Sequence, residues 1–117
     1  MAYDSAADCV IALTTLGSLE EARALVRRLV DSRVVACGTV LAGAVSIYRW
    51  EGKVTESSEA VVLLKTQRER WEDLLEAVKR DHPYEVPELL QIPVQAGLDR
   101  YLEWVRAETA TTEGRRT

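Results

Sequence analysis

The chain has 117 residues, 47% of them apolar, which is enough material for one hydrophobic core and too little for two. Its 15 lysines and arginines against 19 acidic residues give a formal charge of −4, with the two signs interspersed, so nucleic acid is not expected as a partner. No apolar run approaches the roughly 20 residues that cross a bilayer, and no membrane partner is expected.

Residues 1–7 precede the first apolar run and are expected to form a flexible N-terminus. The opening string MAYDSAAD carries two acids and no base, and so lacks the basic region of a secretory signal. A cytoplasmic protein is therefore expected. Residues 8–16 are rich in aliphatic and β-branched side chains and end near a glycine, which predicts a buried strand.

A helix is predicted for residues 19–33. Ser18 and Glu21 have the spacing of a capping box, in which side chains satisfy free backbone donors at the start of a helix. The apolar residues that follow recur at the spacing of one helical face. They are Leu19, Ala22, Leu25, Val26, Leu29 and Val30.

A long β-hairpin is predicted next. Residues 34–50 are strand formers broken only by small residues, and bulges or bends are expected at Gly38 and Gly43. Gly52 can adopt the positive φ of a tight turn. The returning strand, residues 53–65, is polar in its first half and apolar in its second.

A second helix is predicted to begin at a capping box of Thr66 and Glu69 and to end near His82, because proline follows it. Residues 82–88 are expected to form a loop. Residues 88–94 predict a fourth strand, and Asp99 is expected to cap a short last helix.

This order predicts an α+β fold, a ferredoxin-like βαββαβ sandwich with an extended hairpin between its second and third strands and an extra C-terminal helix. One domain is expected over residues 8–109. Residues 110–117 are polar without periodicity and are expected to be disordered.

The hairpin predicts a homo-oligomer. Residues 35–50 as a strand reach about 50 Å, whereas residues 67–82, equal in number, reach about 24 Å as a helix. The hairpin therefore outruns its helical cover and exposes apolar side chains and open strand edges, for which another subunit is the expected cover. Bulges that fold the hairpin back over its own sheet are the monomeric alternative.

Several segments together resemble the CutA divalent-cation tolerance family. They are VVACGTVLAGAVSIYRWEGKV, VLLKT, HPYEVPELL and YLEWV, and the resemblance spans about residues 9 to 106. It implies a ferredoxin-like homotrimer whose hairpins pair across subunits, related in architecture to the trimeric PII signalling proteins. It also implies a cytoplasmic role linked to tolerance of copper and other divalent metals, with no enzymatic activity and no obligatory cofactor.

The resemblance also suggests metal ligands. Proposals for the family use the position of His82, the residue before it, here Asp81, and a cysteine in the first strand where this chain has Thr14. Cys37 is a further candidate, because a soft thiolate binds copper or zinc. The structural alternatives are a helix-terminal role for His82 and core packing for Cys37.

A second candidate site is a ligand cleft at a subunit boundary. Lys65, Tyr84, Glu85 and Glu88 offer opposite charges beside an aromatic ring, and the alternative is an ion-pair network that stabilises the trimer. The aromatic residues Tyr48 and Trp50 flank the hairpin turn and are expected at the trimer interface.

Three functions stay open from the sequence. The first is a non-enzymatic trimer linked to divalent metal tolerance, which binds metal or a small ligand at its subunit interfaces; a PII-like signalling trimer is a variant of it. The second is a structural scaffold with an indirect metal phenotype. The third is an enzyme that pairs Cys37 with His82, for which no orienting third group accompanies the pair.

Overall fold

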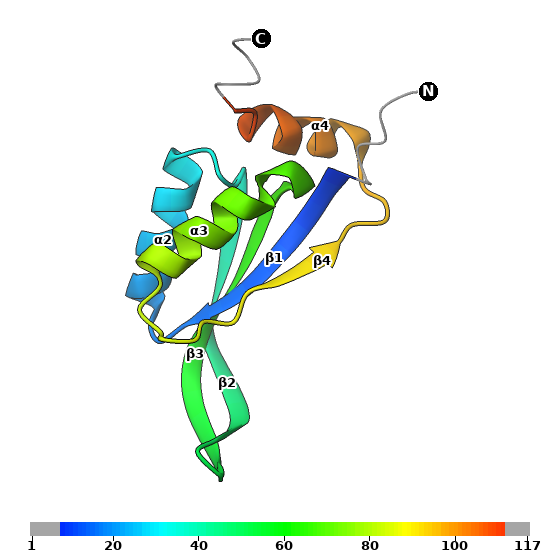
Figure 1. Cartoon of the computed structure of the whole chain (residues 1–117). Coiled ribbons are helices and arrows are strands. Elements are labelled where there is room, and N and C mark those ends of the chain that lie inside the picture. Colours follow the sequence, from blue (N-terminus) through cyan, green and yellow to red (C-terminus); the bar gives the residue numbers. More distant parts are fainter. Residues whose placement is uncertain (1–7, 112–117) are drawn as a thin grey trace.

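The computed structural model describes residues 8–111, and these form one four-stranded antiparallel sheet with helices packed on it (Figure 1). The strands are β1 Cys9–Leu16, β2 Cys37–Trp50, β3 Lys53–Gln67 and β4 Leu90–Pro93. The helices are α2 Leu19–Asp31, α3 Trp71–Asp81 and α4 Asp99–Glu108, with a 3-10 turn, η1 Arg68–Arg70, before α3. The spatial order β2-β3-β1-β4 confirms the predicted fold class.

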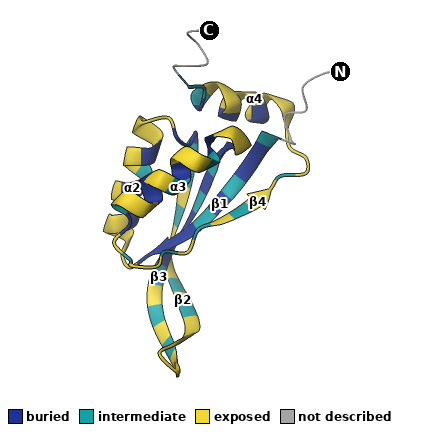
Figure 2. Ribbon diagram, viewed as in Figure 1, coloured by how far each residue is buried: buried dark blue, intermediate teal, exposed yellow. Residues whose placement is uncertain are grey.

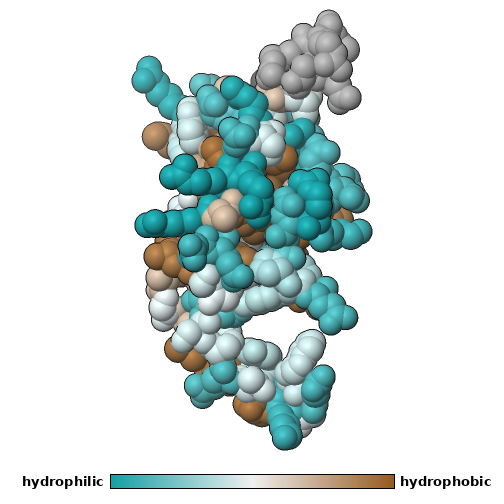
Figure 3. Space-filling view, turned by 90° about the vertical axis from the view of Figure 1, so that its left-hand side faces the viewer, coloured by the Kyte–Doolittle hydropathy of each residue, from teal (hydrophilic) through white to brown (hydrophobic). Residues whose placement is uncertain are grey.

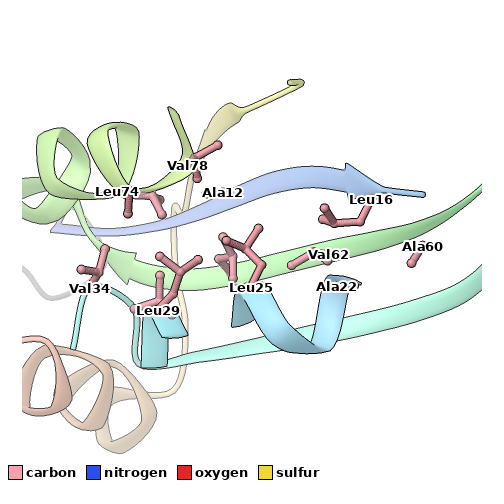
Figure 4. Close-up of a cluster of buried hydrophobic side chains, with 13 residues drawn as sticks. Ala12, Leu16, Ala22, Leu25, Leu29, Val34, Ala60, Val62, Leu74 and Val78 are labelled. Atoms are coloured by element: carbon pink, nitrogen blue, oxygen red, sulfur yellow. The ribbon is translucent and has the colours of Figure 1, made fainter. Parts of the chain in front are cut away.

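Helices α2 and α3 cover one face of the sheet (Figures 1 and 4). Each places its apolar stripe on the strand residues that point toward it, and these contacts form the main core. In Figure 4 the helices contribute Leu25, Leu29, Leu74 and Val78, and the strands contribute Ala12, Leu16 and Val62. The buried residues are therefore concentrated where α2 and α3 pack on the sheet (Figure 2).

The opposite face of the sheet is covered only at one end. There α4 packs Leu102 and Val105 against Cys9 and Ala36. Residues paired across antiparallel strands share a face, so the register places a row of half-buried or exposed apolar side chains beside this end. We call this row the open sheet face; it consists of Ile11, Leu13, Leu41, Val61, Leu63, Leu90 and Ile92.

The β2–β3 hairpin projects beyond the helices and gives the chain extents of 51 × 27 × 23 Å (Figure 1). A register shift between Leu41 and Ala44 surrounds Gly43, which has a φ of 82°, as expected for a bulge. At the turn Glu51 and Gly52 both have positive φ, the combination that matches the twist of a two-residue hairpin. Hydrophobic side chains lie along this projecting hairpin at the lower end of Figure 3.

Several local expectations are wrong. Thr66 does not cap a helix, because it lies in β3, where its hydroxyl donates to the Val34 carbonyl at 2.7 Å. The N-cap of α3 is Arg70, and no side chain caps it. Asp99 is the first residue of α4, after the N-cap Leu98. At Thr66 a tertiary contact overrides the local pattern.

Gly38 is not a bulge. It lies in register opposite Leu64, and a Cβ there would approach a Val26 methyl to 2.8 Å and a Leu64 methyl to 2.9 Å. Glycine is needed because α2 packs closely on the strand. The predicted strand 34–50 likewise begins only at Cys37, because residues 34–36 complete the end of α2 and enter the core. Arg33 has a φ of 64°, and the amide of Val34 donates to the Leu29 carbonyl.

The fourth strand is shorter than the predicted 88–94, since only Leu90–Pro93 pairs with β1. The flexibility expected for residues 1–7 lies outside the described residues, as does most of the disorder expected for 110–117. Ala110 and Thr111 are described, and both are half-buried. Within residues 8–111, no helix has the length and hydrophobicity needed to cross a membrane.

Candidate functional site

His82 lies buried at the junction between α3 and the following loop, and both of its ring nitrogens are engaged. Nε2 lies 2.8 Å from the carbonyl oxygen of Thr15, and Nδ1 lies 3.1 Å from the amide nitrogen of Tyr84. A carbonyl only accepts and an amide N–H only donates, so the proton is on Nε2 and Nδ1 accepts. His82 thereby fastens the loop to the end of β1. A metal ion would have to displace one of these bonds.

Tyr84 continues this network onto the hairpin. Its hydroxyl donates to Glu59 Oε2 at 2.7 Å, and its ring lies 4.8 Å from the imidazole of His82 in an edge-on arrangement. Burial together with the hydrogen bond to Glu59 raises the pKa of Tyr84 far above its ordinary value. The phenol is therefore a fixed donor at neutral pH.

Glu59 is the charged centre of the network. Burial alone favours its neutral form, but hydrogen bonds from Ser46, Tyr84 and Thr15 outweigh burial and lower its pKa. The sequence pattern does not indicate this role, because Glu59 stands among the polar residues of VTESSE and its partners are distant in the chain. The one signal that could have placed Glu59 near Thr15 is the predicted pairing of the first and third strands.

Asp81 neighbours His82 in sequence but faces another way. Arg80 donates to both of its carboxylate oxygens at 3.1 Å, and Arg28 approaches it to 3.7 Å. The hydrogen bonds from Arg80 lower the pKa of Asp81, so the carboxylate is ionised and already has two cationic partners. It does not join the imidazole of His82 in a ready pair of ligands.

Cys37 lies at the other end of the sheet, under α4. Its Sγ is 3.4 Å from the hydroxyl of Tyr101, whose pKa is raised to about 12 by burial and by this contact. Cys9 is buried nearby, and burial raises the pKa of its thiol. The sequence pattern indicates Tyr101 only as part of an apolar helix face, because its contact with Cys37 depends on where α4 docks.

No metal site is assembled within the described part of one chain. Among residues 8–111, no group of three or more histidine, cysteine, aspartate or glutamate side chains is arranged to hold a metal ion. Thr14, at the position of the family cysteine, is completely buried and faces the helices, and its hydroxyl oxygen has no hydrogen-bond partner among the described residues. Within one chain, the side chains suggested as metal ligands, namely Cys37, Asp81 and His82, therefore do not converge on one site.

The candidate cleft residues are also divided within one chain. Lys65 lies opposite Cys37 and Ile11, and its ammonium donates to the Thr39 hydroxyl at 2.7 Å. Tyr84 is hydrogen-bonded to Glu59. Glu59 precedes Lys65 by six residues on β3, which is a separation of about 20 Å in a strand. Glu85 and Glu88 lie on the loop with Tyr84, and both are exposed. Within one chain, Lys65 therefore does not meet this loop.

The two aromatic residues expected at an interface lie on the hairpin. Tyr48 and Trp50 have exposed fractions of 41% and 54%. The hydroxyl of Tyr48 accepts from Ser57 at 3.3 Å across the hairpin, and Trp50 is paired with Lys53 beside the turn. Both rings are therefore available to a partner surface.

Comparison with known proteins gives consistent matches. The family described as CutA1 divalent ion tolerance protein matches residues 10–108. A divalent-cation tolerance protein CutA of Thermus thermophilus is 41% identical over 99 residues, which are 85% of this chain and 96% of that protein. The solved structure of CutA1 from Oryza sativa matches with a TM-score of 0.88 at 29% identity. The match covers 93% of this chain and 100% of the Oryza sativa chain.

The expectation of a cytoplasmic location is wrong as an inference from the family. A relative from Arabidopsis thaliana, 35% identical over 86% of this chain, is named as chloroplastic. A solved relative from Archaeoglobus fulgidus, with a TM-score of 0.84 at 29% identity over 87% of this chain and 99% of its own, is named as periplasmic. The matched region spans only 55% of the Arabidopsis protein. Because targeting segments lie outside a folded domain, the domain does not determine the compartment.

Proposed function

Because the chain belongs to the CutA1 divalent ion tolerance protein family, we propose that it acts as a non-catalytic homotrimer that responds to divalent metals or to a small ligand at its subunit boundaries. The projecting hairpin carries this proposal. Its apolar side chains include Ile47 and Val54, with exposed fractions of 64% and 67%. Exposed apolar side chains beside open strand edges favour association with another chain.

A second surface supports the same assembly. The open sheet face is apolar, and α4 covers only one end of it. Strand β2 is also an edge of the sheet, so its outward backbone groups can pair with another chain. Hairpin, open face and edge strand adjoin one another, and a neighbouring subunit can cover all three together.

The arrangement of Cys37 and His82 argues against nucleophilic catalysis. Cys37 is paired with Lys65, whereas His82 contacts the carbonyl of Thr15, whose partner on β3 is Val61. Four residues along a strand amount to about 13 Å, too far for a base to take a proton from the thiol. Cys37 and His82 therefore do not form a nucleophile and base within one chain.

The assembly is tested by measuring mass in solution. Light scattering coupled to gel filtration should give three times the mass of the 13.1 kDa chain at micromolar subunit concentration. The same mass should persist on dilution over a tenfold range. A mass near that of one chain would reject the trimer and every site that depends on it.

Within this trimer, we place metal or ligand binding at the subunit boundaries. One chain divides Lys65 from Tyr84, Glu85 and Glu88, and it separates Cys37 from Asp81 and His82, so a site built from either set needs residues from two subunits. Copper(II) is the metal to test first, since imidazole is a good ligand for it. Displacement of the His82 hydrogen bonds would make such a site weak.

Calorimetric titration distinguishes this binding trimer from a scaffold. Copper(II) and zinc(II) are titrated into the wild type, His82→Ala and, as a control for nonspecific binding to surface carboxylates, Asp73→Asn. Stoichiometric heat that disappears only in His82→Ala supports a metal site at His82. Equal weak heat in all three proteins favours the scaffold with an indirect metal phenotype. The PII-like variant predicts instead that Lys65→Gln removes binding of a small anionic ligand while the trimer mass is unchanged.

A further inference from the structure

A groove of about 770 Å³ lies on the helical side of the molecule, where the C-terminal half of α2 meets α3. It is separate from the hairpin and the open sheet face, so it does not depend on the proposed trimer. Four arginines line it, namely Arg28, Arg33, Arg70 and Arg80. The acids Asp31, Asp73, Glu76 and Asp81 also line it.

The charges differ between the two ends of this groove. At the C-terminal end of α3, Asp81 is already held by Arg80 and Arg28. The N-terminal end of α3 lies beside the end of α4, where Gln67 donates to the Thr109 hydroxyl at 2.9 Å. Arg33 donates to the Glu108 carbonyl at 3.3 Å and forms an exposed ion pair with the Glu108 carboxylate at 3.4 Å. Arg33 and Arg70 both line the groove, and the exposed ion pair of Arg33 is of a kind that contributes little to stability.

Arg70 has hydrogen-bonding capacity that the fold does not use. Its side chain is only 10% exposed, and Nη1 donates to Asp73 Oδ2 at 2.8 Å. Its Nε is buried without a hydrogen-bond partner in the described part of the chain. A buried donor without a partner is unfavourable, and this one belongs to a planar cation suited to bidentate binding of an oxyanion.

The start of α3 adds the positive end of a helix dipole to this end of the groove. Arg70 is the N-cap of this 11-residue helix, and no side chain accepts from the first-turn amides as a cap. The amide of Trp71 donates to the Arg68 carbonyl of η1, so the contribution of this helix end is the positive end of its dipole, which favours an anion. Asp73 is the competing carboxylate at this place, and it engages Arg70 through Nη1 alone.

We propose that this end of the groove binds the phosphate group of a small molecule, with Arg70 and Arg33 as its cationic contacts beside the N-terminal end of α3. Binding moves the Arg70 guanidinium from its single contact with Asp73 to the ligand and gives Nε a partner. The groove is open beyond this point and leaves room for the remainder of the ligand.

The test uses inorganic phosphate as the probe, with chloride at matched ionic strength as the reference. In the wild type, phosphate should raise the melting temperature in a saturable manner, because a ligand of the folded state shifts the unfolding equilibrium. The rise should disappear in Arg70→Gln. It should persist in Arg23→Gln, which removes the same charge from an exposed position on α2 outside the groove.

An NMR titration of the wild type keeps the proposal testable if Arg70→Gln does not fold. Phosphate should shift the amide resonances of Glu72 and Asp73 along saturable curves, while those of the hairpin stay in place. Equal stabilisation of all three proteins, or no amide shift at roughly 10-fold or higher excess over the protein, would overturn the site. Neither result would bear on the trimer, since its mass is measured separately.

Discussion

At the scale of single residues, Glu59 has the most consequential environment. Its carboxylate accepts from Tyr84, and through Tyr84 and His82 it links the hairpin to the loop after α3. The same hydrogen bonds lower its pKa below the ordinary value of 4.5. A group whose pKa is lower in the folded state stabilises the fold while it is ionised.

Glu59→Gln should therefore destabilise the protein in a pH-dependent way. Near pH 7 we expect a loss of about 1 kcal/mol in the free energy of unfolding, because a charged acceptor is lost from a partly exposed site. The contribution of Glu59 is complete above pH 4.5 and is lost as the pH falls through the folded-state pKa. Wild type and variant should thus converge in acid.

Urea denaturation at a fixed subunit concentration measures this difference, since unfolding of an oligomer depends on concentration. Glu85→Gln is the matched control, because Glu85 is exposed on the loop that carries Tyr84. A difference between wild type and Glu59→Gln that stayed constant down to about pH 3, well below the ordinary carboxyl range, would contradict the assigned role.

At the scale of elements, the packing of α2 on β2 depends on Gly38. The neighbouring methyl groups of Val26 and Leu64 leave no room for a Cβ. Gly43 differs, since a Cβ at that position would have no neighbour within 4 Å, and its φ of 82° is the constraint. The two glycines of one strand thus serve different purposes, close approach and backbone conformation.

Gly38→Ala should cost about 1–3 kcal/mol in unfolding free energy, the usual penalty for overpacking a core. Gly43→Asn should cost less than about 1 kcal/mol, because asparagine tolerates positive φ better than other residues. Thermal or urea unfolding of both variants checks this ranking. The reverse order would show that α2 can move away from β2 at little cost.

At the scale of the whole molecule, the proposed trimer depends on the hairpin. Ile47 is 64% exposed on it, and burying such a side chain contributes about 1.5–3 kcal/mol per copy. In the proposed trimer each subunit carries this side chain, so one substitution removes three such contributions to the free energy of assembly.

Ile47→Lys should therefore dissociate the trimer at low micromolar concentration, because each subunit then has to bury an ammonium group. Val30→Lys is the control, since Val30 is exposed on the last turn of α2, away from the hairpin, where a cation is favourable. Light scattering measures both. Retention of the wild-type mass by Ile47→Lys at every concentration would place the interface elsewhere.

The sequence by itself determined the order of elements, the extended hairpin and the family, because hydrophobic periodicity, turn glycines and long distinctive strings are local properties. It predicted the capping of α2 correctly, and Ser18 does accept from the amide of Glu21 at 3.1 Å. Local pattern failed at Thr66 and Gly38, where contacts from distant parts of the chain decide the role of the residue.

Only the tertiary structure decided how the functional side chains are grouped. It showed both nitrogens of His82 in use, separated Lys65 from Tyr84 along β3, and brought Glu59 to Tyr84 and Arg70 to the groove between α2 and α3. Strand register and helix docking set these distances. Both depend on packing between segments far apart in the chain, and a local pattern carries no measure of that packing.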